Sequence, residues 1–199
     1  MTIDKNDMLN SILEMLSQID YIHPGDIPNI DLYMDQVTTF MDKQLASTKR
    51  YEDDKILTKT MINNYAKNHL LPPPVKKKYS REHVLLLIFI YYFKNILSIK
   101  DIEVLLKPVT EKYFEKAGGI DLSSLYEKIC EMERERIESF KETVKGAYEA
   151  AASSFGDTPD DERDFIQLFA FICNLSFDVY IKKQLIEKLI DEFSGQESS

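Results

Sequence analysis

Apolar side chains recur every three or four residues along most of this chain, the spacing that places them on one face of an α-helix. The pattern is longest from Leu122 to Ala151, where it keeps close to a 3.6-residue period. A strict seven-residue repeat fails there, because Arg136, Ser139 and Thr143 would lie on the seam. The sequence therefore predicts an all-α protein with one long, straight helix packed on others.

The same spacing predicts helices elsewhere, with proline and glycine marking their ends. Pro108 is expected to end one helix, and Gly118-Gly119 to separate two domains. Residues 84–93 are apolar on nearly every side, so their helix is predicted to be the buried centre of a domain. That helix spans about 81–95, and the other predicted helices span about 4–19, 31–45, 58–70, 99–106, 110–117, 160–172 and 176–193.

Charge is distributed unevenly along the chain. Residues 55–81 contain seven Lys and Arg and no Asp or Glu, although the formal net charge of the protein is −9. The remainder of the chain therefore carries about −16. A cationic segment in an anionic protein is typical of a surface that meets a polyanion, and the alternative is an ordinary solvated face.

Local signals predict a short helix inside this cationic segment. Thr58 is a good N-cap, and the helix must stop before the proline run 72–74. Its apolar residues share one face, and its opposite face would carry Lys59, Thr60, Asn63, Asn64 and Lys67. Three consecutive lysines, Lys76, Lys77 and Lys78, follow in a short extended or turn segment. A polar helix face beside a lysine-rich loop suits double-stranded DNA.

The segment from Leu57 to Leu106 resembles the winged helix-turn-helix head of the MerR-type bacterial transcription regulators. Met61-Ile62-Asn63-Asn64-Tyr65 fits the recognition-helix motif of that family, and His69-Leu70-Leu71-Pro72-Pro73 fits the turn after it. Tyr79-Ser80 fits the exit from the wing, and Leu97-Ser98-Ile99-Lys100-Asp101-Ile102 fits the start of a later helix. Residues from about 30 to 106 also resemble a bacterial family of unassigned function, domain of unknown function 1836.

The resemblance implies a winged helix-turn-helix head with a minimal or absent β wing, followed by a C-terminal helical bundle. Residues 1–30 would form an N-terminal helix and loop, 31–117 the helix-turn-helix domain, and 118–199 a dimerisation or effector domain. The chain departs from the MerR pattern in its wing, which is several residues shorter and has Lys76 to Lys78 in place of an Arg-rich hairpin, and at two single positions. Asn63 replaces an arginine that contacts DNA, and His69 replaces a glycine and would need an uncommon backbone conformation.

The predicted function is a DNA-binding transcriptional regulator. Thr60, Asn63 and Asn64 would contact bases, while Tyr65 and Tyr79 brace the fold. The partners expected are double-stranded DNA, a second copy of the chain in a homodimer, and a small-molecule effector. The alternative is a protein–protein interaction module that has lost DNA binding. Phosphates would be held by Lys59, Lys67, Lys76, Lys77, Lys78 and Arg81.

Other classes of function find little support in the sequence. No catalytic motif, phosphate-binding glycine loop or metal-ligand pattern is present, so we expect no enzyme activity, cofactor or metal. Cys130 and Cys173 lie inside helical patterns and form no Cys-x-x-Cys pair. We therefore expect them to be small buried apolar residues in a protein from a reducing compartment. Residues 84–93 are too few to span a bilayer, and the acidic, polar N-terminus does not read as a signal peptide. A cytoplasmic protein that does not contact membranes is expected.

Aromatic residues are frequent in the C-terminal helices. Their helical spacing favours ordinary core packing, and the alternatives are an effector pocket or a dimer face. The residues concerned are Phe165, Phe169, Phe171, Phe177 and Tyr180.

Overall fold

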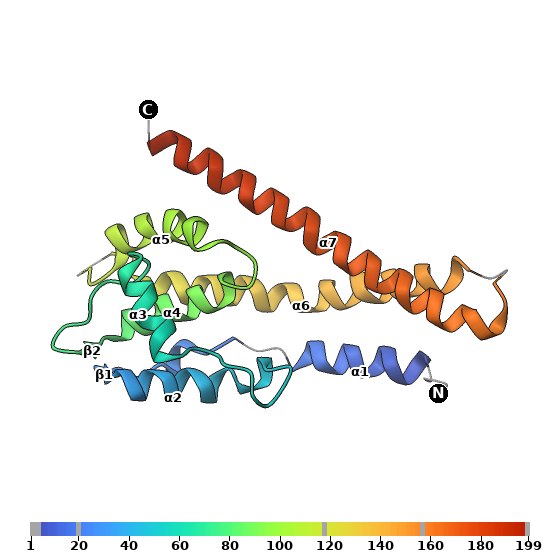
Figure 1. The fold of residues 1–199 in the computed structure, drawn as a ribbon, viewed down its shortest axis with the longest axis horizontal. Helices are drawn as coiled ribbons and strands as arrows, with labels where there is room; N and C mark the ends of the chain where they lie inside the picture. Colours follow the sequence, from blue (N-terminus) through green and yellow to red (C-terminus); the bar gives the residue numbers. More distant parts are fainter. Residues whose placement is uncertain (1–4, 19–20, 117–118, 156–157, 198–199) are drawn as a thin grey trace. The chain divides into compact units, whose positions relative to one another are not determined.

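The fold is seen in a computed structural model, which describes residues 5–18, 21–116, 119–155 and 158–197 (Figure 1). These residues are mostly helical, so the all-α prediction is confirmed, and they include one small antiparallel sheet of two strands. The helices are α1 (Lys5–Ser17), α2 (Met34–Gln44), α3 (Lys59–Lys67), α4 (Arg81–Phe93), α5 (Ile99–Tyr113), α6 (Leu122–Ser153) and α7 (Asp160–Glu197), with short 3-10 turns at Pro24–Asp26 and Ala46–Thr48; the strands are β1 (Leu32–Tyr33) and β2 (Lys78–Tyr79).

Two compact units divide the chain. One comprises Met1–Tyr21 with Glu131–Leu185, and the other comprises Ile22–Cys130 with Ile186–Ser199. We call residues 22–130 the head. The long helices α6 and α7 each contribute to both units. The predicted domain boundary between residues 117 and 118 lies outside the described residues.

Helix α4 forms the centre of the head, as predicted. Every side chain from His83 to Tyr91 is buried, because this helix is apolar on all sides and needs neighbours all round. Helix α5 and strand β2 contact it directly. The first turns of α6 also belong to this core: the Tyr126 ring meets the Phe89 ring edge-on, and the Tyr126 hydroxyl donates to the Ile22 carbonyl at 2.7 Å.

The other unit has its own smaller core. Leu16 of α1, Val144 and Ala151 of α6, and Phe171 of α7 are buried against one another. Tyr148 of α6 meets the Phe171 ring edge-on, with the ring centroids 5.4 Å apart. The predicted long helix at residues 122–151 is thereby confirmed, and it buries different stretches in the two cores.

Two predicted helix ends are wrong. Pro108 lies inside α5, which continues to Tyr113, because burial of Ile102, Leu106 and Pro108 supports the helix past the position where proline usually ends it. The break predicted before Ser176 is absent from α7 as well. The Ser176 hydroxyl donates to the Ile172 carbonyl at 2.8 Å and so bonds within the helix instead of capping a new one.

Helix α7 is also unusual in its exposure. Among the described residues, one helix is long enough and apolar enough to cross a membrane by length and composition alone, and it is the part of α7 from Glu162 to Gly195. The prediction that its aromatic residues pack in a core is wrong for Phe165, Phe169, Phe177 and Tyr180, which are exposed, and correct for Phe171.

His83 is a polar residue in the core of the head, at 1% exposure. Its Nδ1 accepts the Ser80 backbone N–H at 3.1 Å, completing a capping box at the start of α4. Its ring meets Tyr79 and Phe114 edge-on, and its Nε2 is buried without a hydrogen-bond partner. Burial lowers the pKa of His83, and the nearby Pro73 carbonyl opposes this shift only in part.

The head should therefore lose stability as the pH falls below the usual histidine pKa of 6.5. There the unfolded chain binds a proton more readily than folded His83 does, because burial of the ring disfavours its charged form. Each unit by which the pKa is lowered corresponds to about 1.4 kcal/mol. Urea unfolding from pH 8 to 5 should show this loss, and the non-titrating His83→Gln should flatten the curve. A wild-type curve that is already flat would contradict the prediction.

Candidate nucleic-acid interface

Helix α3 presents the predicted polar face to solvent. It begins at the N-cap Thr58, whose hydroxyl oxygen accepts the Met61 N–H at 3.2 Å. Ile62 and Tyr65 are buried, α3 contacts α2, and burial raises the pKa of Tyr65. The residues predicted to contact DNA from this helix are all exposed: Lys59, Thr60, Asn63, Asn64 and Lys67.

The end of α3 is closed by a left-handed residue. His69 has φ 58°, so the uncommon conformation predicted for it is confirmed. The Leu70 N–H donates to the Tyr65 carbonyl at 3.0 Å, and the His69 N–H donates to the Ala66 carbonyl at 3.3 Å. This pair of bonds is the Schellman motif, in which glycine is the usual left-handed residue. It turns the chain sharply and buries Leu70.

The lysine run forms a tight hairpin. The Lys78 N–H donates to the Val75 carbonyl at 2.9 Å, and Val75 and Lys78 form an antiparallel bridge. Lys76 and Lys77, between them, both have positive φ, 51° and 64°. Two successive left-handed residues define a type I′ turn, whose twist matches that of paired strands. The turn displays both exposed lysines at its tip.

Strand pairing anchors this hairpin to the head. Leu32 of β1 pairs with Tyr79 of β2, and Tyr33 pairs with Lys78. The Lys78 ammonium lies over the Tyr33 ring, 5.4 Å from its centroid, and is half-buried. Tyr79 is buried, as its predicted bracing role requires, and burial raises its pKa.

Arg81 is occupied inside the head. Its guanidinium donates to the carbonyls of Ile27 at 2.6 Å and Pro24 at 2.5 Å, and to the Ser123 hydroxyl at 3.3 Å. It therefore joins the start of α4 to the loop before β1 and to the start of α6. Among the nine predicted site residues, Arg81 has its guanidinium held by three hydrogen bonds inside the head.

Lys59 also has a partner within the head. Its ammonium forms an ion pair with the Asp35 carboxylate at the start of α2, and both side chains remain exposed. An exposed pair of this kind contributes little to stability and is readily exchanged for another anion. Lys67, Lys76 and Lys77 complete the set of exposed cations on α3 and the hairpin.

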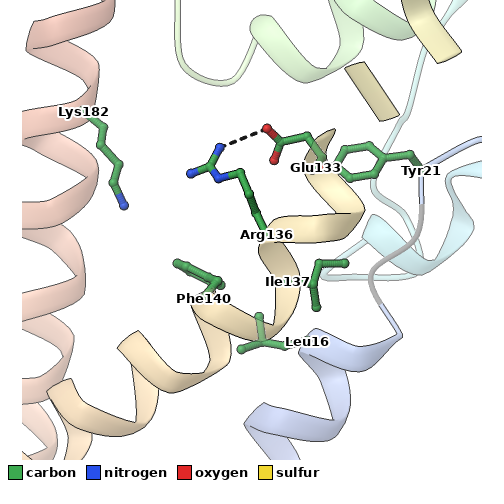
Figure 2. Close-up of a pocket in the computed structure, with 7 residues that line it drawn as sticks. All are labelled: Leu16, Tyr21, Glu133, Arg136, Ile137, Phe140 and Lys182. Carbon is green, nitrogen blue, oxygen red and sulfur yellow. Dashed lines mark hydrogen bonds and ion pairs between the residues drawn. The ribbon is translucent and has the colours of Figure 1, made fainter. Parts of the chain in front are cut away.

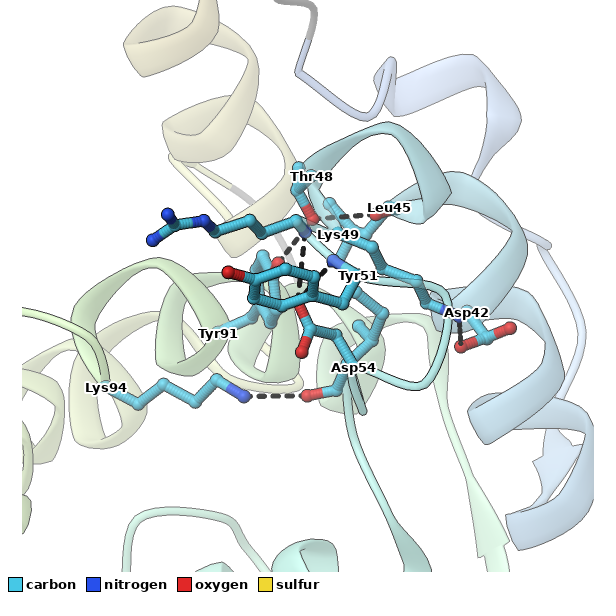
Figure 3. Close-up of polar contacts among 10 residues, drawn as sticks. Asp42, Leu45, Thr48, Lys49, Tyr51, Asp54, Tyr91 and Lys94 are labelled. Carbon is cyan, nitrogen blue, oxygen red and sulfur yellow. Dashed lines mark hydrogen bonds and ion pairs between the residues drawn. The ribbon is translucent and has the colours of Figure 1, made fainter.

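The segment between α2 and α3 is long and is tied to α4 (Figure 3). Thr48 and Tyr91 share a hydrogen bond through their hydroxyls. The Asp54 carboxylate accepts the backbone N–H groups of Arg50 and Tyr51, each at 3.0 Å. These bonds give an irregular connection a fixed course up to the start of α3.

Lys94 is a positioning residue that the sequence did not single out. Its ammonium donates to the Ile56 carbonyl at 2.7 Å and lies 4.9 Å from the centroid of the Tyr91 ring. Burial lowers the pKa of Lys94. Ile56 lies two residues before the N-cap Thr58, so this bond fixes where α3 begins. The sequence feature that could have indicated this role is the place of Lys94, directly after an almost wholly apolar helix.

A separate pocket of about 230 Å³ lies in the other unit (Figure 2). Leu16, Ile137 and Phe140 give it apolar walls, while Arg136 and Lys182 supply cations. Arg136 is paired with Glu133 at 3.0 Å. Glu133 also lines the pocket, and Lys182 is paired with Asp178 at 3.7 Å, so both cations have acidic partners. The described residues contain no group of three or more His, Cys, Asp or Glu side chains that could hold a metal ion.

The geometry defines a helical protein in which α3 and the hairpin after it expose Lys59, Lys67, Lys76 and Lys77 in a stretch of sequence without acidic residues. A family model described as a domain of unknown function, DUF1836, matches residues 22–129, which nearly coincide with the head. The chain belongs to this family. No curated protein and no solved structure matches the chain.

Replacing His69 by glycine should stabilise the head. A left-handed conformation is strained for residues with a side chain, and glycine adopts it freely, so we expect a gain of about 0.5–1 kcal/mol. His69→Val should be destabilising, because a β-branched residue tolerates positive φ least. Thermal unfolding of the three proteins should follow the order Gly, His, Val. The control Asn68→Gly, at the C-cap with φ −95°, should give no gain.

Proposed function

We propose that the head is a winged helix-turn-helix that binds double-stranded DNA, and that the protein is a cytoplasmic transcriptional regulator without enzyme activity. In this proposal α2 and α3 form the helix-turn-helix, α3 enters the major groove, and the hairpin at residues 75–79 is the wing. The observation that carries it is the set of exposed amides and cations on α3, next in sequence to a hairpin that displays two lysines at its tip.

Base contacts are assigned to Asn63, Asn64 and Thr60. An asparagine amide can pair with both the N6 and N7 edges of adenine, and a pair of this kind discriminates by about 1–3 kcal/mol. Helix α3 carries its amides on the solvent side, while Ile62 and Tyr65 hold the opposite side in the head. That arrangement leaves the amides available to a groove.

Phosphate contacts are assigned to five lysines. Lys67, Lys76 and Lys77 are exposed, while Lys59 and Lys78 would leave the Asp35 carboxylate and the Tyr33 ring. Arg81 is omitted because its guanidinium is bound to carbonyl groups of the head. Five neutralised phosphates would give a slope of log affinity against log salt of roughly −4 to −5.

The internal roles of Arg81 and Lys59 favour a second candidate. A head that uses these cations for its own structure, in a protein of net charge −9, is compatible with a protein–protein interaction module that no longer binds DNA. The two functions differ in one simple property. The second predicts no retention on heparin or on mixed-sequence duplex DNA at low salt.

The double variant Lys76→Asn/Lys77→Gly tests the wing directly. Asn-Gly is the preferred pair for a type I′ turn, so the hairpin should keep its shape while losing two charges. Affinity for a mixed-sequence duplex should fall at least about tenfold, and the salt slope should decrease by about 2. Fluorescence anisotropy across a salt series measures both quantities.

The matched control is Lys145→Gln/Lys188→Gln, which removes the same charge outside residues 22–130. It should leave the slope unchanged. Equal affinity and slope for the hairpin variant and the wild type would remove the wing from the proposal. Absence of any salt-dependent binding by the wild type would favour the second candidate.

A further inference from the structure

Both ends of the lysine hairpin lie against the buried ring of His83. At the end of the hairpin, Tyr79 meets this ring edge-on with the centroids 5.6 Å apart, and the Ser80 N–H donates to Nδ1 at 3.1 Å. Before its start, the carbonyls of Pro72 and Pro73 lie near enough to the ring to favour its charged form. The hairpin therefore leaves and rejoins the head at a group that can take up a proton.

Two further elements surround the same ring. Phe114, at the end of α5, meets it edge-on with the centroids 4.9 Å apart. The carboxylates of Glu115, after α5, and Asp31, before β1, favour a proton on the ring. Burial outweighs these charges, so the pKa of His83 is lowered. The ring consequently binds a proton less readily while it is covered than after water reaches it.

The hairpin is held to the head by few bonds. Strands β1 and β2 have two residues each, and Lys76 and Lys77 at the tip both adopt positive φ. A two-stranded hairpin is marginally stable without support from its surroundings. Helix α4, in contrast, is buried along its length. Elements with little buried apolar surface open before the core does, so we expect the hairpin to yield first.

We propose that His83 is a proton-sensitive switch, in which a proton on its ring releases the hairpin from the head while α4 and the rest of the core stay folded. Opening brings water to the charged ring and to Nε2, which has no hydrogen-bond partner among the described residues. Acid thereby determines whether Lys76 and Lys77 are displayed on a fixed turn or on a mobile loop.

Glu82, next to His83 in α4, responds to acid in the opposite direction. Burial raises its pKa, and the nearby carboxylates of Glu115 and Asp121 add to this shift. A raised pKa means that the folded head favours the protonated carboxyl, so acid strengthens the structure around Glu82. Loss of hairpin order in acid is therefore the effect expected of the His83 ring and not of this carboxyl.

Hydrogen exchange of the full chain, followed by NMR at single amides, tests the switch. The Lys78 N–H donates to the Val75 carbonyl at 2.9 Å and reports on the hairpin, while Ile88 in the buried middle of α4 reports on the core. After correction for intrinsic exchange rates, protection of Lys78 should fall about fivefold between pH 7.5 and 5.5, because opening gains up to about tenfold per pH unit below the usual histidine pKa. Low concentrations of urea should accelerate exchange at Ile88 and hardly change it at Lys78, since a local opening exposes little surface.

Two variants and one direct measurement serve as controls. In His83→Gln, glutamine can still accept the Ser80 N–H as in the usual capping box, but it cannot take up a proton, so protection of Lys78 should not depend on pH. His23→Gln removes an exposed histidine elsewhere in the head and should keep the wild-type response. The ring signals of His83 in the wild type report its pKa without any substitution, and this pKa should lie below the usual value.

Four results would overturn the proposal. These are pH-independent protection of Lys78 in the wild type, a pH response that persists in His83→Gln, equal urea dependence at Lys78 and Ile88, or acid-induced exchange at Phe114 in place of Lys78. The switch does not depend on DNA binding. If the hairpin is the wing, duplex DNA at low salt should restore protection of Lys78 at pH 5.5, and failure to do so would contradict the proposed function alone.

Discussion

Burial of α4 on every side is the constraint on which the head depends. A helix without a polar face must be surrounded, and the surrounding elements are its sequence neighbours β2 and α5 together with the first turns of α6. Polar side chains at the two ends of α4 then bind the irregular segments of the head. Arg81 at the start binds the loop before β1, and Lys94 at the end binds the segment before α3. Helix α3 is thus positioned through contacts that begin at the core of the head.

The sequence predicted the parts of the fold that follow from periodicity. Most of the predicted helices, the buried centre of α4, the exposed face of α3 and the uncommon backbone conformation of His69 appear in the structure, whereas the separate helix predicted at residues 110–117 does not, because α5 continues to Tyr113. The errors occurred where packing competes with local preference. Proline usually ends a helix and serine is unfavourable inside one, yet α5 continues past Pro108, which is buried, and α7 continues past Ser176, whose hydroxyl bonds to the Ile172 carbonyl within the helix.

Helical periodicity also made part of the candidate site predictable. Exposure of Asn63 and Lys67 follows from helical spacing around Ile62 and Tyr65. The separate roles of similar cations do not follow from spacing. Arg81 and Lys76 lie in the same cationic run, but one is bound to carbonyls and the other is displayed on a turn. Only the folded arrangement of distant segments distinguishes them.

The lysine hairpin couples folding to ionic conditions in two opposite ways. Lys76 and Lys77 are held next to each other in left-handed conformations, so their charges repel within a turn that is already strained. Dissolved salt screens that repulsion and so favours the ordered hairpin in the free protein. The same salt would weaken attraction to any polyanion. A bound polyanion would neutralise the two ammonium charges itself, and the hairpin would then stay ordered without added salt.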